Sequence, residues 1–286
     1  MSGIEQWLLV APIWLIGIVI YLGMLVAAML GWQLRKRYVG EDSERSHNEE
    51  GYIVSSVMGL LALLVGFTFA LAIDRYDTRR AVVLAEANAI GTTYLRTQML
   101  EEPHRTRISE LLTDYTANRI DLARQHVGKE QEERLAASDS MIVELWQATV
   151  AAFPTIETRP FSSAYLSTMN EMIDMDAARQ QSRRSHVPVE VFLVLILYQI
   201  IAAGVLGYVL GGRRGRTTAA LLLLLFGGSL ILVIDIDRPN AGGIVERQVA
   251  MELLLKMMRE NPAGSFDRTA PAITPALASP PAPAPQ

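Results

Sequence analysis

The sequence predicts an all-α membrane protein: four transmembrane helices in two hairpins, with an extramembrane helical domain between the hairpins. Three observations support this fold class. Four long segments are apolar and almost free of charge, the central region has apolar residues at helical spacing, and the composition is unusually apolar. Of the 286 residues, 50% are hydrophobic and only 20% are charged, a combination that is uncommon in soluble domains.

The first hairpin is predicted over residues 1–73, with spans at about 8–34 and 52–73. Residues 7–34 carry no charge, and at about 1.5 Å per residue they exceed a hydrocarbon core of roughly 30 Å. Trp7, Trp14 and Trp32 lie towards the ends of this segment, as interfacial aromatic residues do. A charged loop, 35–50, connects the two spans.

The extramembrane domain is predicted over residues 74–188, with about four helices and no strand. Its first helix should continue from the second span, because no strong helix breaker occurs between Ile73 and Leu100. Pro103 is placed to start a helix, and Pro154 and Pro160 bracket a break.

The second hairpin is predicted over residues 189–236, with spans at about 189–210 and 217–236. The Gly- and Arg-rich loop 211–216 is so short that the two helices must be antiparallel neighbours. A juxtamembrane C-terminal helix is expected over 237–261, followed by a disordered Pro/Ala-rich tail over 262–286.

The distribution of basic residues predicts the orientation. The short loops 35–50 and 211–216 are rich in Arg, which places them in the cytoplasm and the central domain outside it. The flanks of the domain oppose this orientation, because they carry six arginines of their own: Arg75, Arg79, Arg80, Arg179, Arg183 and Arg184.

Several classes of function have no support in the sequence. There is no cysteine, the four histidines (47, 104, 126 and 186) are scattered, and no common catalytic or phosphate-binding motif occurs. We therefore expect neither an enzyme nor a bound cofactor or metal. The net charge of −4 argues against nucleic acid as a partner.

Small residues recur four apart in the second and third spans. They allow helix backbones to approach closely, either within a protomer or between protomers; the alternative is a close-packed ring of second spans around a pore. The residues are Gly51, Ser55, Gly59, then Ala62, Gly66, Ala70, and in the third span Ala203, Gly207 and Gly211. Gln199, the strongly polar side chain deep in a span, is expected to form an interhelical hydrogen bond.

Charged residues should gather at the membrane face next to the domain, where the second and fourth spans both end. Ion pairing is the favoured interpretation, and a cation site or a gate latch is the alternative. Glu86, further along, is expected on a solvated helix face. The expected cluster is Asp74, Arg75, Asp77, Glu190, Asp235, Asp237 and Arg238.

Two short segments resemble the bestrophin anion channels. Residues 64–76 place Gly66-Phe67 eight residues before Arg75-Tyr76, and residues 237–242 resemble the acidic-x-Pro…Gly segment after the last bestrophin span. Residues 49–96 are more similar to the bacterial bestrophin-like family DUF4239. The resemblance implies a homo-oligomer in a bacterial cytoplasmic membrane that passes an inorganic anion, without calcium control.

The same resemblance implies a pore neck on the second span. Carried over residue by residue, the neck positions fall on Gly59, Leu63 and Phe67, although bestrophins have a bulky apolar residue at the first of these. The resemblance also implies a cytoplasmic domain, opposite to the orientation that the loops predict. The rival hypothesis is a membrane-anchored helical scaffold or sensor that conducts nothing.

Overall fold

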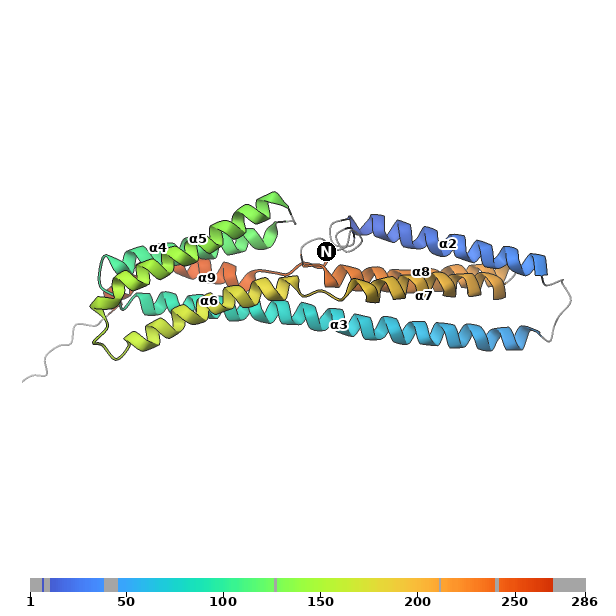
Figure 1. Ribbon diagram of the computed structural model, residues 1–286, viewed down its shortest axis with the longest axis horizontal. Helices are drawn as coiled ribbons and strands as arrows, with labels where there is room; N and C mark the ends of the chain where they lie inside the picture. Colours follow the sequence, from blue (N-terminus) through green and yellow to red (C-terminus); the bar gives the residue numbers. More distant parts are fainter. Residues whose placement is uncertain are drawn as a thin grey trace, which may run out of the picture.

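The computed structural model describes residue 7 and residues 11–38, 46–125, 128–210, 212–239 and 242–269. Regular secondary structure in this part of the chain is entirely helical. The helices form an elongated molecule with a membrane half and an extramembrane half placed end to end (Figure 1). The predicted fold class is confirmed.

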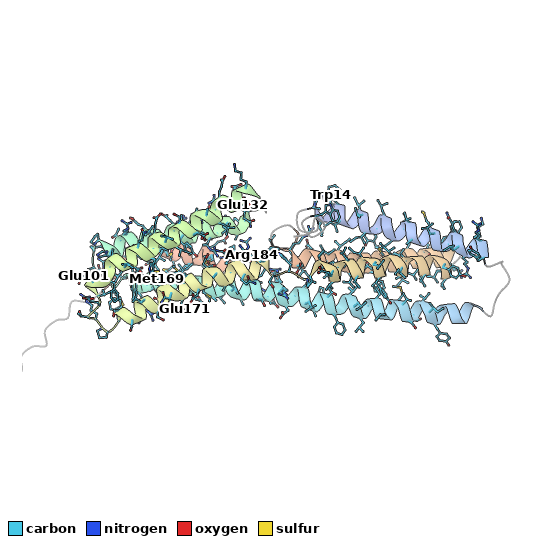
Figure 2. The ribbon with its side chains drawn as sticks, viewed as in Figure 1. Trp14, Glu101, Glu132, Met169, Glu171 and Arg184 are labelled. Atoms are coloured by element: carbon cyan, nitrogen blue, oxygen red, sulfur yellow. The ribbon has the colours of Figure 1, made fainter. Side chains whose placement is uncertain are left out.

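The membrane half consists of α2 (Ile13–Tyr38), the first part of α3 (Ser46–Thr97), α7 (Val189–Val209) and α8 (Gly212–Asp237). All four segments are long and apolar enough to cross a bilayer. α7 and α8 contact both α2 and α3, so α2 and α3 lie on opposite sides of the α7–α8 pair (Figure 1). The outer surfaces of these helices are covered with apolar side chains such as Trp14 (Figure 2), as expected of surfaces that meet lipid.

Helix α3 belongs to both halves. It runs without interruption for 52 residues, which confirms that the second span continues into the domain. At about 1.5 Å per residue such a helix is roughly 78 Å long, well beyond the thickness of a bilayer. The membrane half and the extramembrane half therefore share one continuous backbone element.

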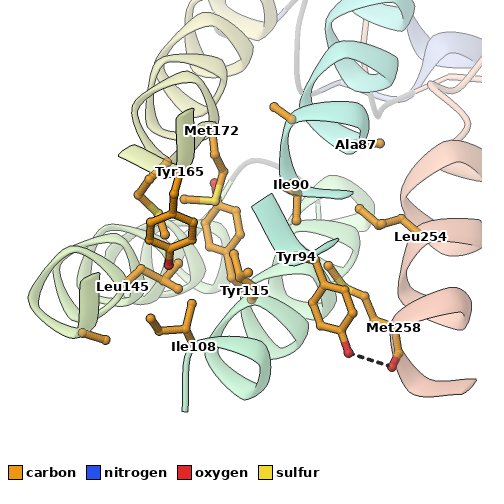
Figure 3. Close-up of a cluster of buried hydrophobic side chains, with 14 of the residues drawn as sticks. Ala87, Ile90, Tyr94, Ile108, Tyr115, Leu145, Tyr165, Met172, Leu254 and Met258 are labelled. Atoms are coloured by element: carbon orange, nitrogen blue, oxygen red, sulfur yellow. Dashed lines mark hydrogen bonds between the residues drawn. The ribbon is translucent and has the colours of Figure 1, made fainter. Parts of the chain in front are cut away.

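In the extramembrane half the second part of α3 packs against α4 (His104–Arg124), α6 (Ser162–Arg184) and α9 (Val249–Glu260), and α5 (Lys129–Ala152) packs on α4. A short 3-10 helix, Phe153–Thr155, follows α5 at the predicted break. Figure 3 shows the core, in which Ile90, Tyr115 and Tyr165 are inaccessible or nearly so. The hydroxyl of Tyr94 donates to the carbonyl oxygens of Met258 (3.3 Å) and Asn261 (2.6 Å), which anchors the end of α9 to α3.

Four predicted boundaries are wrong. The fourth span was expected from about residue 217, but α8 begins at Gly212, so most of the predicted loop 211–216 is helical. The first span was expected from about residue 8, but α2 begins at Ile13, directly after Pro12, a residue that suits the start of a helix; residues 8–10 lie outside the described part. The helix expected over 237–261 forms only over Val249–Glu260, because Pro239 and the glycines at 242 and 243 interrupt it. Residues 262–269, expected to be disordered, contain the 3-10 helix Ser265–Thr269, and Asp267 pairs with Arg105 at 2.7 Å. Residues 270–286 lie outside the described part.

Candidate functional site

One face of α3 is left uncovered by the part of the chain that the structure describes. Leu63 and Phe67 are 53% and 62% exposed, whereas Leu61 and Val65 on the opposite face are buried against α7 and α8. No atom lies within 4 Å of the position that a Cβ would take at Gly59 or Gly66. The three predicted neck residues thus lie on an outer surface of the protomer.

Leu60 lies beside these residues and was missed from the sequence. It is 47% exposed and precedes Phe67 by seven residues, which places the two side chains on the same face, two helical turns apart. The resemblance assigned this level of the helix to Gly59, one position earlier. A large apolar side chain is therefore present beside Gly59, at the level where bestrophins have a bulky apolar residue.

The small residues of the second span do not pack within the protomer. Gly51, like Gly59 and Gly66, has no atom within 4 Å of its Cβ position. Small residues in α7 behave differently: a Cβ at Gly207 would lie 2.0 Å from the carbonyl oxygen of Ala28 in α2. Close packing is therefore confirmed for α7; Gly211 lies outside the described part. The small residues of α3 contact no other described helix closely, so they are accessible to a second molecule or to lipid.

The exposed face of α3 continues into the extramembrane half. Asp74 and Asp77 are exposed directly after the membrane segment, followed by Ala81, Ala85 and Asn88 at helical spacing. Asp74 is seven residues after Phe67 and therefore lies on the same face. The face changes from apolar in the membrane half to mixed in the domain, where the exposed Leu84 lies seven residues after Asp77.

The predicted cluster of charges at the junction forms only in part. Asp237 is buried and accepts a hydrogen bond from the backbone amide of Val187 (3.0 Å), and the imidazole Nδ1 of His186 lies 3.5 Å from its other carboxylate oxygen. The buried guanidinium of Arg238 donates to the carbonyl oxygen of Ala11 at 2.8 Å. Asp74 and Glu190 are exposed instead, and Arg75 donates to the hydroxyl of Ser185.

Asp235 has a structural role. Its carboxylate accepts backbone hydrogen bonds from Gly243 (3.0 Å) and Ile244 (3.2 Å), which turns the chain back towards the domain. A Cβ at Gly242 would lie 1.9 Å from the same carboxylate, so only glycine fits there. These backbone donors compensate the carboxylate of Asp235 for its burial at the end of a membrane helix.

A second set of buried charges lies inside the domain. Glu86 is fully buried and not on a solvated face, so that expectation is wrong. One of its carboxylate oxygens accepts from Nε of Arg119 at 2.7 Å, and the other accepts from Arg179. Arg119 also pairs with Asp176 at 2.6 Å. Glu86 therefore joins α3 to α4 and α6 through two guanidinium groups.

The network extends to the segment between α8 and α9. Arg179 donates to the amide oxygen of Gln248 at 2.5 Å, and Gln248 donates to the carboxylate of Glu246 at 2.9 Å. Tyr115 donates to Asp176 at 3.1 Å, and burial raises the pKa of this phenol, so that it stays a protonated donor. We call the set Glu86, Arg119, Asp176, Arg179 and Glu246 the buried charge network.

Two other sequence predictions can be compared with the geometry. Gln199 is buried and donates to the carbonyl oxygen of Phe226 at 2.9 Å, so the predicted interhelical hydrogen bond is confirmed. In the described part of the chain, no three His, Asp or Glu residues are arranged to hold a metal ion.

The comparisons with known proteins agree with this architecture. A model of the bestrophin-like domain matches residues 22–248. A bacterial bestrophin homolog from Klebsiella pneumoniae has a similar structure, with a TM-score of 0.65 at 12% identity, covering 85% of this chain and 96% of that chain. A point mutant of a bacterial bestrophin homolog from the same organism gives 0.63 at 11% identity over 85% and 96% of the two chains. No curated protein matches the sequence.

Proposed function

Because the chain belongs to the bestrophin-like family, we propose that this multi-pass membrane protein forms a homo-oligomeric ion channel whose α3 helices surround a central axis. The observation that supports the proposal is the uncovered face of α3, which carries Leu60, Leu63 and Phe67. α2 lies on the far side of α7 and α8, so copies could meet along α3 while α2 faces lipid.

In such an oligomer Leu63 and Phe67 form stacked apolar rings, because residues four apart share a helix face. An apolar constriction of this kind gates by dewetting and holds no fixed charge. Gly59 contributes no side chain, and Leu60 beside it supplies bulk at the same level. The neck of the proposed pore then spans two turns of α3.

The resemblance implies anions as the permeating ions, and anion selectivity requires cationic groups near the neck. Arg75, Arg79 and Arg80 are the arginines that directly follow the second span. The arrangement of these arginines weakens that part of the argument. Arg79 is buried and donates to the carbonyl oxygen of Ile236 at 2.9 Å, and Arg75 is directed to Ser185. Arg80 stacks on Tyr76 at 5.8 Å.

Asp74 favours a second candidate, a channel that passes inorganic cations. It is exposed on the same face as Phe67, and rings of acidic side chains attract cations in channels. A single substitution separates the two candidates. Asp74→Asn should lower the cation flux if the channel passes cations, and it should raise the anion flux if the channel passes anions.

The test of the channel itself is ion flux into liposomes that contain the purified protein. Leu63→Ala with Phe67→Ala should raise flux, because the rings widen and hydrate. A matched control is Leu221→Ala with Leu225→Ala, since both residues are exposed on α8 and lie four apart. Background flux from the wild type and both variants, with folding and oligomeric state verified, would support the scaffold or sensor instead.

The oligomer is tested separately, by the mass of the protein in mild detergent and by the presence of a central opening in particle images. Gly66→Leu should reduce the oligomeric fraction, because bulk is added to a face that α3 leaves free for a neighbouring copy. A monomeric wild type would overturn the proposed assembly.

A further inference from the structure

A cavity of about 520 Å³ opens on the side of the membrane half opposite to the exposed face of α3. It lies between α2 and α8, and its walls are formed by Met24, Leu25, Met29, Leu223 and Leu224. This volume is within the range of about 300–1,000 Å³ found for ligand pockets. Because α2 and α8 are both membrane helices, the molecules available to this cavity are lipids.

A second cavity of about 470 Å³ continues along the same helix pair. The two share Tyr21 and Leu25, and Tyr21 reaches across from α2 to donate to the carbonyl oxygen of Leu224 at 2.8 Å. The second cavity extends to Ile13 and Ile231, at the domain end of the spans. The two cavities together form an apolar groove that follows α2 for most of the length of the membrane half.

The end of the groove near the loops carries positive charge. Arg216 lines the first cavity and lies 5.9 Å from the ring of Trp32, which also lines it. The ammonium group of Lys36 lies 5.9 Å from the same ring. Among the described residues that line this cavity none is acidic, and Gln33 adds a polar amide. Two cations and an aromatic side chain thus stand where lipid headgroups lie.

We propose that this groove binds one anionic glycerophospholipid, with an acyl chain between α2 and α8 and the phosphate beside Lys36 and Arg216. Basic pockets between transmembrane helices are suited to anionic headgroups, and each cation near the phosphate strengthens binding. The apolar walls hold the chain, and the charges at the mouth distinguish anionic from zwitterionic headgroups. The site is independent of the proposed channel, because it lies on the opposite side of the α7–α8 pair from α3.

Fluorescence quenching tests the proposal, because Trp32 lies at the mouth of the groove and is 40% exposed. In a full-length variant with Trp7, Trp14 and Trp146 replaced by Phe, Trp32 is the remaining tryptophan. This protein is reconstituted in phosphatidylcholine vesicles that contain either brominated phosphatidylglycerol or brominated phosphatidylcholine. The ratio of the two association constants should favour phosphatidylglycerol by about fivefold or more.

Substitutions at the mouth should remove this preference. Lys36→Gln with Arg216→Gln should lower the ratio to about one, whereas Arg214→Gln should leave it unchanged, because Arg214 is exposed near the start of the same helix, α8, but does not line the groove. The ratio within each variant is compared, since loss of Arg216 also alters the emission of Trp32 itself. An equal effect of Arg214→Gln would overturn the proposal in favour of diffuse attraction to the surface.

Filling the groove tests the position of the acyl chain. Ala220→Phe should weaken quenching by both brominated lipids, because Ala220 lines the cavity. Leu221→Phe is the matched control, since Leu221 is exposed on the same helix and does not line the cavity. A wild type that is quenched equally by both lipids, or a preference that persists in Lys36→Gln with Arg216→Gln, would also overturn the proposal.

Discussion

At the scale of single residues, the buried charge network dominates the electrostatics of the domain. Three carboxylates and two guanidinium groups lie within the core, each of them at most 9% exposed. Taking such groups out of water carries a large desolvation cost, which is offset only while every partner is present. The network therefore contributes chiefly by fixing how α3, α4, α6 and the segment before α9 fit together.

Glu86→Gln should destabilise the domain strongly. The substitution keeps the size of the side chain but leaves Arg119 and Arg179 with a reduced set of negative partners. Breaking a buried pair in this way costs about 3–5 kcal/mol. The free energy of unfolding in urea, followed by circular dichroism in mild detergent, measures the loss.

The matched control is Glu252→Gln, which removes the 2.7 Å ion pair between Glu252 and Arg124 on the surface. Exposed pairs contribute roughly 0–1 kcal/mol, so this variant should unfold almost like the wild type. If both variants lose the same free energy of unfolding, the buried ion pairs of Glu86 contribute no more to stability than an exposed pair does.

The residue scale also shows what the sequence can and cannot reveal. Gln199 could be predicted, because a lone amide in an apolar span needs a partner on a neighbouring helix. Glu86 could not, because its partners are 33 and 93 residues away along the chain. Its immediate neighbours are Ala85 and Ala87, and the helical pattern alone does not distinguish a buried acid from a solvated one.

At the scale of elements, glycines divide the membrane helices into two kinds of surface. Gly207 and Gly31 allow α7 and α2 to touch through their backbones; a Cβ at either position would lie 2.0 Å from a carbonyl oxygen of the other helix. Gly66 on α3 has open space around it. Glycine thus allows close backbone contact between α2 and α7, whereas on α3 it lies on an open surface.

Gly207→Ala and Gly66→Ala should therefore have opposite effects on the protomer. Alanine favours a helix over glycine by about 1 kcal/mol in both cases. At Gly207 the added methyl group forces α2 and α7 apart, and overpacking of this kind costs about 1–3 kcal/mol. Thermal unfolding in detergent should show a lower Tm for Gly207→Ala and an unchanged or higher Tm for Gly66→Ala. A loss of similar size in both would mean that α3 also packs closely through Gly66.

The elements were predicted better than their ends or their partners. The four spans, the unbroken helix after Ile73 and the break near Pro154 follow from hydropathy, helical period and proline. The start of the C-terminal helix was misjudged, because the turn after α8 is held by backbone hydrogen bonds to Asp235, which are set by folding rather than by local propensity. The small-residue stripes in α3 and α7 have the same spacing, so the sequence could not tell which one is covered.

At the scale of the whole molecule, the orientation in the membrane stays a prediction. The arginines of the loops and the arginines that flank the domain favour opposite orientations. The loops 35–50 and 211–216 favour a domain outside the cytoplasm. Arg35, which the sequence assigns to the first of these loops, lies in the last turn of α2 and donates to the carbonyl oxygens of Tyr208 and Val209 at 2.9 and 2.6 Å, which caps the end of α7. One of the arginines counted for the orientation thus also stabilises the contact between α2 and the end of α7.

A reporter enzyme that is active only in the cytoplasm tests the orientation. Fused after residue 214 it should be active, and fused after residue 130, in the domain, it should be inactive. A second reporter that is active only outside the cytoplasm should give the reverse pattern. If both reporters place residue 130 in the cytoplasm, the domain has the orientation that the resemblance implies.

The close contact between α2 and α7 also constrains how the chain is made. Gly31 lies against Gly204, 173 residues later in the sequence. At a synthesis rate of about 5–20 residues per second, α2 waits roughly 9–35 s in the bilayer before its partner has been translated. During that interval the surface that later meets α7 is open to lipid or to insertion factors. Biogenesis therefore passes through a stage in which the first membrane helix is held without its final neighbour.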